Sequence, residues 1–308
     1  MVKLKIEHSF NQSFELILLF FFILLNLSCS PDDDEDDLEP PRDYLEQSLD
    51  DDQRLIQYLK SHYYNYEDFS DISNHEKEII IDTILSENIN LKSLFDFAVS
   101  STVTLASSEG ELIEHKLYHV IVKDGIRIDD KPSIADSVYL SYKGKLLDGN
   151  VFDKKENPVW FDTANVIRGF RYGLQYFSPG NFIQRENGTI EFKQFGRGLI
   201  FMPSGLGYFN SAQTNIPTYS PLIFEVSVFT INRADHDNDG VLSIDEDPNN
   251  DGNPYNDDTD EDSIINMYDE DDDGDGILTK DELDGDDPDN LPDDSNNDGI
   301  PDYLDKNT

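Results

Sequence analysis

The chain has 308 residues and a formal net charge of −42, with 65 acidic against 23 basic side chains. The acids are clustered, because residues 31–52 hold 12 acids and one Arg, and residues 235–308 hold 29 acids and two Lys. A surface of this sign repels a polyanion, so nucleic acid is excluded as a partner and divalent cations are the natural counter-charge. The middle of the chain has an ordinary composition and is long enough for one good hydrophobic core.

Residues 1–29 have the features of a targeting segment. Lys3 and Lys5 precede an unbroken apolar run at 16–25, which is too short to span a membrane as a helix but suits a signal peptide. The only cysteine, Cys29, follows this run, so no intramolecular disulfide can form. The arrangement resembles a bacterial lipoprotein signal, with Asn26 where that pattern usually has Leu, and implies a membrane anchor through a lipidated Cys29. A plain secreted protein is the alternative.

Residues 30–42 form an acidic tether that cannot bury anything and must be solvated. An acidic run directly behind a lipidated cysteine resembles the export tag of some Gram-negative surface lipoproteins. This resemblance implies an outer-membrane protein that faces the cell surface. A periplasm-facing protein with a simple acidic linker is the alternative.

Residues 43–112 are predicted to form a small helical segment without catalytic chemistry. Four apolar side chains of its first helix share one face: Leu55, Ile56, Leu59 and Tyr63. Capping-box spacing at 73–76 predicts a second helix over the following EIIIDTIL, although three successive isoleucines also suit a strand. Leu91, Leu94 and Phe95 predict another short helix.

Residues 113–233 read as a β-rich domain. The stretch 116–125 predicts a strand with Leu117, His119 and Ile121 on one face. Alternation around Val138 and Leu140 predicts another strand with one buried face. Residues 221–231 are almost wholly apolar, which suits the middle of a sheet.

Several separated motifs in this domain occur in a specific order. They are DSVYLSYKGKLLDGNVFD at 136–153, VIRGF at 166–170, MPSGLGY at 202–208 and NIP at 215–217, followed by the apolar strand. Together they resemble an FKBP-type peptidyl-prolyl cis-trans isomerase domain over roughly residues 115–232. The resemblance implies an α+β fold, in which an antiparallel half-barrel sheet wraps on a short helix.

The resemblance also implies a site that needs no nucleophile and no cofactor. Its parts are a hydrophobic cup for a proline ring, one backbone N–H to hold a carbonyl, and polar groups at the rim. The cup would comprise Tyr142, Phe152, Val166, Ile167, Phe170, Tyr208 and Phe224, with Asp153 as the rim acid and the Ile167 N–H as the donor.

Three positions depart from the family pattern. Phe170 stands where Trp is most common at the floor of the cup, which implies lower activity or altered drug affinity. Val159 replaces a wall aromatic, and Trp160 or Phe161 could compensate. Residues 178–198 are longer than the usual connection, and the Asn187-Gly188 pair inside them predicts an extra hairpin or flap beside the cup.

The acidic tail, residues 234–308, contains three segments with the spacing of calcium loops. Side-chain oxygens, one carbonyl and a turn glycine recur at the positions that a hard cation requires. The predicted ligands are Asp235, Asp237, Asp239, Val241, Ser243 and Glu246; Asp271, Asp273, Asp275, Ile277, Thr279 and Glu282; and Asp294, Asn296, Asp298, Ile300, Asp302 and Asp305. A weaker fourth candidate begins at Asp247 and uses Asn249, Asp251 and Asp258.

Pro248 prevents a long exit helix after the first loop, so paired helix-loop-helix hands and a calcium-sensor role are disfavoured. The short loops resemble thrombospondin type 3-like or other extracellular calcium repeats, in which calcium is structural. A disordered acidic tail is the alternative. Without calcium, mutual repulsion should leave the tail unfolded.

Two functions follow from these predictions. The first is a prolyl isomerase or folding helper that acts on proline-containing segments of exported proteins. The second is a non-catalytic FKBP-like binding module on a calcium-rigidified stalk at the cell surface. Phe170 and Val159 favour the second function, whereas Tyr142, Asp153, Ile167 and Tyr208 together favour the first.

Overall fold

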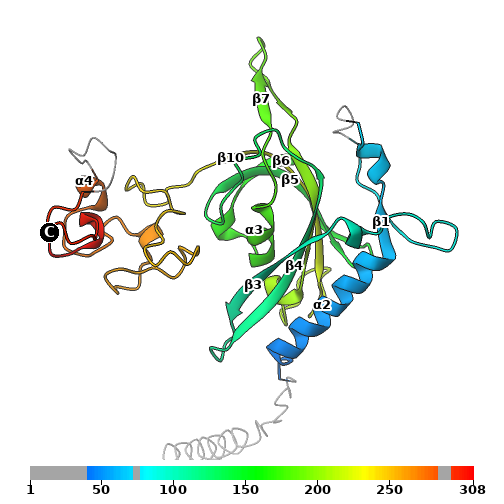
Figure 1. Ribbon diagram of the computed structural model, residues 1–308, viewed down its shortest axis with the longest axis horizontal. Coiled ribbons are helices and arrows are strands. Elements are labelled where there is room, and N and C mark those ends of the chain that lie inside the picture. Colours follow the sequence, from blue (N-terminus) through cyan, green and yellow to red (C-terminus); the bar gives the residue numbers. More distant parts are fainter. Residues whose placement is uncertain (1–39, 72–76, 284–292) are drawn as a thin grey trace, which may run out of the picture. The chain divides into compact units, whose positions relative to one another are not determined.

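The computed structural model describes residues 40–71, 77–283 and 293–308 (Figure 1). The chain divides into residues 1–41 and a compact unit from Arg42 to Thr308. Cys29 and most of the acidic tether lie outside the described residues. Among the helices that are described, none is long and apolar enough to cross a membrane.

The second unit combines strands with a few short helices. Its helices are α2 (Tyr44–Ser61), α3 (Arg168–Leu174) and α4 (Thr279–Glu282). Its strands are β1 (His62–Tyr64), β2 (Ile81–Thr83), β3 (Val99–Ala106), β4 (Leu112–Lys123), β5 (Ser137–Leu146), β6 (Val151–Asp162), β7 (Asn181–Gln184), β8 (Ile190–Lys193), β9 (Gly196–Met202) and β10 (Leu222–Asn232). Single 3-10 turns are η1 (Tyr66–Phe69), η2 (Leu94–Asp96), η3 (Thr163–Asn165), η4 (Ser204–Leu206), η5 (Asn266–Tyr268) and η6 (Asp302–Leu304).

Six strands form one antiparallel sheet in the order β3-β4-β9-β10-β5-β6. Helix α3 lies in the curve of this sheet, where Phe170 and Leu174 pack with Val226 in the main core (Figure 1). The helix approaches β9 closely, since a Cβ at Gly173 would lie 2.6 Å from Ile200 Cγ2. The predicted α+β class is therefore confirmed, and the apolar strand β10 lies in the middle of the sheet as expected.

Helix α2 packs against the opposite face of the same sheet. Leu55 and Leu59 are fully buried there against Tyr118, Val120 and Phe201. The alternation predicted for β4 explains this arrangement, because its odd residues face α3 and its even residues face α2. The sheet thus has an apolar layer on each side.

Residues 43–112 contain less helix than predicted. Helix α2 is present, but the last residue of the isoleucine run, Ile81, begins strand β2, which pairs with β1 so that Tyr63 opposes Asp82. The predicted third helix is only the 3-10 turn η2, and residues 99–106 form β3, which pairs with β4. Pairing partners that are distant in sequence decided these segments, which local helix spacing cannot reveal. Of the predicted capping box at 73–76, nothing lies within the described residues.

A buried carboxylate fastens α2 to the loop that follows β9. Asp51 is 0% exposed and accepts hydrogen bonds from the Ser204 backbone N–H (2.7 Å), the Ser204 hydroxyl (2.5 Å) and Gln47 Nε2 (2.9 Å). Burial raises the pKa of Asp51, and these hydrogen bonds partly oppose that rise. Ser204 begins η4, which leads directly to Tyr208.

Replacing Asp51 by Ala should lower the free energy of unfolding by about 1–3 kcal/mol, because it leaves the buried Ser204 N–H without an acceptor. Urea unfolding followed by circular dichroism would measure the change. Asp50→Ala is the matched control, since Asp50 is exposed on the same helix. Equal stabilities of the two variants would contradict the role given to Asp51.

Candidate functional site

An apolar cavity of about 220 Å³ opens between β5, β6, α3 and β10. The structure places all eight residues named from the sequence around it, and adds Phe161 and Asn165. The full lining is Tyr142, Phe152, Asp153, Phe161, Asn165, Val166, Ile167, Phe170, Tyr208 and Phe224. We call this cavity the cup.

Strand register and one glycine bring the cup together. Tyr142 faces the core from β5 and opposes Val226 of β10. Phe152 lies at the start of β6, and its ring occupies the space beside Gly144, where a Cβ would lie 2.5 Å from Phe152 Cζ. A side chain at position 144 would therefore displace one wall of the cup.

The floor of the cup is a cluster of aromatic rings. The centroid of Phe170 lies 4.8 Å from that of Phe224, 5.8 Å from that of Tyr142 and 6.3 Å from that of Phe161. The tilted and edge-on ring geometries are favourable for aromatic pairs. Phe170 is only 4% exposed, so it keeps the floor apolar without an indole.

Of the two residues that could compensate for Val159, only Phe161 lines the cup. Trp160 is 52% exposed and packs its ring 5.3 Å from Tyr139, on the opposite face of β5 from Tyr142. The alternation of side chains along β6 separates these two neighbours.

Two phenols and one carboxylate form the polar rim. The Tyr142 hydroxyl donates a hydrogen bond to Asp153 Oδ2. Burial, followed by the hydrogen bond and the charge of Asp153, raises the pKa of Tyr142, and burial and Asp153 also raise that of Tyr208. Both phenols therefore stay protonated at neutral pH. The Tyr208 hydroxyl has no hydrogen-bond partner among the described residues, so it can donate to a bound chain.

A backbone donor lies at the same rim. Ile167 immediately precedes α3, and its carbonyl accepts from the N–H groups of Phe170 and Arg171. Within the described part of the chain, its own N–H has no hydrogen-bond partner. The N–H of Ile167, which lines the cup, is thus available to a ligand carbonyl.

The predicted extra hairpin exists, but it does not border the cup. Strands β7 and β8 pair around a turn in which Gly188 has φ +83°. The Phe192 ring lies 5.4 Å from Tyr139 and 5.5 Å from Phe229, on the outer face of the sheet. The prediction of a flap beside the cup is wrong, because these aromatic contacts hold the base of the hairpin on the other face.

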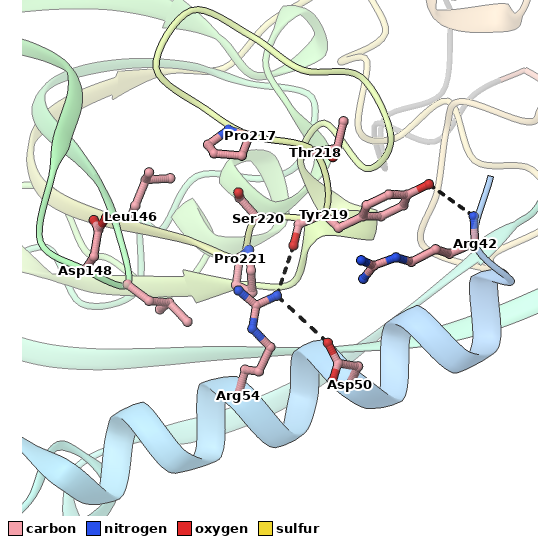
Figure 2. A pocket seen from close by; sticks show the side chains of 11 residues that line it. Arg42, Asp50, Arg54, Leu146, Asp148, Pro217, Thr218, Tyr219, Ser220 and Pro221 are labelled. Carbon is pink, nitrogen blue, oxygen red and sulfur yellow. Dashed lines mark hydrogen bonds and ion pairs between the residues drawn. The ribbon is translucent and has the colours of Figure 1, made fainter. Parts of the chain in front are cut away.

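A larger but more polar cavity of about 560 Å³ lies between α2 and residues 217–221 (Figure 2). Arg54 Nη1 donates to the Tyr219 carbonyl (3.0 Å), and Arg42 lies 4.4 Å above the Tyr219 ring (Figure 2). Both guanidinium groups therefore already have partners in the protein. The cavity shares no residue with the cup. The contacts of Arg42 and Arg54 with Tyr219 hold α2 against residues 217–221.

The described part of the acidic tail contains five loops with one backbone pattern. In each loop the fourth and sixth residues have positive φ, and the N–H of the sixth residue donates to the first aspartate. The loops are residues 235–246, 247–258, 258–269, 271–282 and 294–305. The weak candidate at Asp247 thus has the same backbone as the three strong ones.

Sequence reasoning missed the loop that begins at Asp258. Ser263 takes the place of the turn glycine there with φ +83°, a strained conformation for a residue with a Cβ. Asp258, Asp260 and Asp262 nevertheless bring one oxygen each to within 4.8 Å of one another. The D-x-D-x-D spacing alone, without the glycine, would have revealed this loop.

The acidic side chains of two predicted loops also converge. Asp235, Asp237 and Asp239 form one group within 4.8 Å, and Asp271, Asp273 and Asp275 form another. The loop at 294–305 forms no such group among the described residues. There Asp305 Oδ2 accepts from Asn296, at 2.8 Å.

The ninth residue of each strong loop, a predicted ligand, accepts a hydrogen bond from the second residue of the same loop. Ser243 Oγ accepts from the His236 N–H (3.1 Å), Thr279 Oγ1 from the Asp272 N–H (3.2 Å) and Asp302 Oδ1 from the Ser295 N–H (2.8 Å). The chain runs back beside the start of the loop, as the hydrogen bonds from Ser243 N to the Ala234 carbonyl (2.9 Å) and from Thr279 N to the Glu270 carbonyl (3.0 Å) show. This path turns the ninth side chain toward the second residue.

Comparisons with known protein families match two separate parts of the chain, with the boundary between residues 229 and 236. Residues 129–229 match the family model of FKBP-type peptidyl-prolyl cis-trans isomerases, and residues 236–290 match a model described as BamM C-terminal. The matches thus separate the sheet with its cup from the acidic loops.

Several curated relatives match over about 100 residues of this chain. A probable FKBP-type 25 kDa isomerase of Pseudomonas aeruginosa is 32% identical over 95 residues, which cover 30% of this chain and 35% of the relative. A probable FKBP-type isomerase of Haemophilus influenzae is 37% identical over 101 residues, which cover 32% and 36%. The match to FkpA of Escherichia coli K12 is 28% over 108 residues and covers 34% of each chain. The chain thus matches about a third of the length of these relatives.

Among solved structures, an isomerase from Pseudomonas syringae has a TM-score of 0.32 and 22% identity, covering 42% of this chain and 81% of that chain. FkpA of Escherichia coli has a TM-score of 0.31 and 26% identity, covering 42% and 51%. The residues that build the cup all lie within the range that matches the family model of FKBP-type peptidyl-prolyl cis-trans isomerases, residues 129–229.

Proposed function

We propose that the protein is a peptidyl-prolyl cis-trans isomerase that acts on proline-containing polypeptide segments. The observation that carries this proposal is the apolar aromatic cup with three unlike polar groups at one rim: the Asp153 carboxylate, the Ile167 N–H and the Tyr208 hydroxyl. The cup lies inside the FKBP-type domain, and its relatives bear the same activity in their names.

The cup would act on a conformational barrier and breaks no bond. Rotation about a prolyl amide faces a barrier of about 20 kcal/mol, because resonance keeps the amide planar. Around a proline ring held against Phe170 and Phe224, little water remains to stabilise the polar planar amide. The twisted amide is less polar, so it loses less on entering the cup, and the rate of rotation rises.

The rim would hold the chain on either side of the proline. The Ile167 N–H and the Tyr208 hydroxyl are donors suited to substrate carbonyls. Asp153 fixes the Tyr142 hydroxyl, so the phenol presents its ring to the cup and does not compete for a substrate carbonyl. A hydrophobic cup with few polar contacts fits many sequences around one proline, as a folding helper for exported proteins requires.

A non-catalytic binding module is the second candidate. It is favoured by the presence of Phe170 at the floor of the cup, where FKBP-type domains most often have Trp. A cup that holds planar and twisted amides equally well binds proline segments without accelerating rotation. The two candidates share one ligand class and differ in turnover alone.

We also propose that the tail binds calcium as a structural ion. The buried end of the first loop supports this proposal, because Glu246 is 1% exposed and neither of its carboxylate oxygens has a hydrogen-bond partner among the described residues. Burying an unpaired carboxylate costs several kcal/mol, which a divalent cation would offset. The two convergent aspartate groups and the shared loop backbone fit the same ion.

Finally, we propose that Cys29 carries a lipid anchor that holds the protein at the outer membrane, facing the cell surface. The proposal rests on sequence alone: the apolar run at 16–25, the lone cysteine behind it and the acidic run from Asp32. A tether of this charge stays extended and solvated, which would hold the cup away from the membrane.

The isomerase proposal predicts that the full-length protein accelerates cis-trans isomerisation of a short Xaa-Pro peptide in a protease-coupled assay. Tyr208→Ala and Asp153→Ala should each lower kcat/KM by about tenfold or more, since each removes a polar contact at the rim. Tyr139→Ala, on the opposite face of the same strand as Tyr142, is the control. A folded protein that binds the peptide but leaves the rate at its uncatalysed value would overturn catalysis and leave the binding module.

The calcium proposal predicts that millimolar Ca²⁺ raises the melting temperature of the tail above that in chelator. Binding to the folded state alone stabilises by about 2.7 kcal/mol at a hundredfold excess over Kd. Differential scanning calorimetry with Ca²⁺, Mg²⁺ and chelator would measure the shift, and peptide isomerisation in the same buffers would show any link to the cup. Coincident melting curves with Ca²⁺ and with chelator would refute a structural ion.

The anchor proposal predicts that the full-length protein, produced in a Gram-negative host, incorporates radioactive palmitate. Cys29→Ser should abolish this label, because no other cysteine is present. Protease added to intact cells should degrade the anchored protein if it faces outward. Equal labelling of both proteins would show that Cys29 is not the lipidated residue, and protection from protease would favour the periplasmic orientation.

A further inference from the structure

One carboxylate of the tail leaves its own loop, residues 271–282, and approaches the first loop, residues 235–246. Asp272 is the second residue of the loop at 271–282, a position that the calcium-loop template does not use. It is 2% exposed, and neither of its carboxylate oxygens has a hydrogen-bond partner in the part of the chain that the structure describes. One of its oxygens lies within 4.8 Å of an oxygen of Asp239 and one of Glu246, both of the first loop.

Other loops use the second residue differently. The His236 ring lies 2.7 Å from Ser243 Oγ, Asn266 Nδ2 donates to Thr259 Oγ1 (2.8 Å), and Ser295 Oγ donates to Asp302 Oδ2 (2.6 Å). In each case the second side chain bonds to the ninth residue of its own loop. In the loop at 271–282 only the Asp272 backbone N–H makes that contact, so the carboxylate is directed elsewhere.

The end of the first loop that Asp272 approaches contains carboxylates without a positively charged partner among the described residues. Among the described residues, no Lys, Arg or His forms an ion pair with Asp237, Asp239, Glu246 or Asp272, and all four have at least one buried oxygen without a partner. Burial and the neighbouring carboxylates raise the pKa of Glu246 to about 9 and that of Asp272 to about 8. Four carboxylates this close would repel one another strongly without a cation between them.

The ligand count of the first loop explains what Asp272 would add. Ca²⁺ takes roughly six to eight oxygens. The loop itself offers Asp235, Asp237, Asp239, the Val241 carbonyl and a bidentate Glu246. The ninth residue, Ser243, is fully buried and accepts hydrogen bonds from within its loop, which leaves one ligand position to fill.

We propose that Asp272 fills this position, so that one Ca²⁺ is shared by the loops at 235–246 and 271–282. This inference rests on the proposed calcium binding of the tail and adds a specific site with a ligand from a second loop. The shared ion would fasten together two loops whose first residues are 36 positions apart in the sequence. Calcium binding at the first loop would then order the whole stretch of chain between them.

The test is a calcium titration of the full-length protein by calorimetry after removal of bound metal with chelator. Asp272→Asn preserves the size of the side chain and removes its charge. It should weaken one site by at least about tenfold, because even groups that only support metal ligands contribute about 10–100-fold. Asp281→Asn is the matched control, since Asp281 is exposed in the same loop and the substitution removes the same charge.

A double-mutant cycle separates a shared site from general loss of charge. Glu246→Gln should weaken the same site, and the double variant should lose much less than the sum of the two effects, because both residues bind one ion. Limited proteolysis of residues 247–270 gives a second readout: Ca²⁺ should protect this stretch in the wild type and in Asp281→Asn, but less in Asp272→Asn.

The outcomes distinguish the two proposals. A wild-type protein that binds no Ca²⁺ would overturn calcium binding by the tail as a whole. A wild-type protein that binds Ca²⁺ while Asp272→Asn retains every site at unchanged affinity would overturn the shared site alone. Additive losses in the double variant would likewise contradict a single shared ion.

Discussion

The pairing of β10 on both of its edges determines most of this structure. One edge bonds to β5 and the other to β9, so a strand from the end of the domain lies at the centre of the sheet. Its residues Phe224, Val226 and Val228 then face α3, and Ile223 faces α2. Burial on both faces explains why the strand is almost wholly apolar, and the same placement puts Phe224 beside Phe170 in the cup.

The cup depends on that arrangement from both sides. Beneath it, α3 fixes Phe170 and the preceding Ile167, and on the far side α2 holds the loop to Tyr208 through Asp51 and Ser204. The N-terminal helix therefore supports the candidate site without touching it. A proline pocket that must stay dry benefits from a frame of this kind, because small displacements of its aromatic walls would admit water.

The cup could be predicted from the sequence because its residues lie in ordered motifs whose strand periodicity fixes the face of each side chain. Tyr142 follows from alternation with Val138 and Leu140. By contrast, the 181–193 hairpin packs on the outer face of the sheet because Phe192 contacts Tyr139 and Phe229, which are far away in the sequence. No local pattern in the hairpin contains that information. The helices expected after α2 were lost to strand partners for the same reason.

In the acidic loops, too, some features could be predicted from the sequence and others could not. Their backbone follows from spacing, since alternate residues of a tight turn point inward. What spacing cannot show is a side chain that crosses to another loop, as Asp272 does, or a serine that adopts the glycine conformation, as Ser263 does. Nor does spacing show that Ser243 and Thr279 accept hydrogen bonds from the second residues of their own loops.

The outward position of Trp160 has a consequence for spectroscopy. This residue is the single tryptophan of the chain, and its indole lies on Tyr139, on the face of β5 opposite the cup. Because the floor of the cup holds Phe170, intrinsic indole emission has no source inside the cavity. Fluorescence of the native protein would thus report on the outer face of the sheet near the hairpin, and occupancy of the cup would need a label on the ligand.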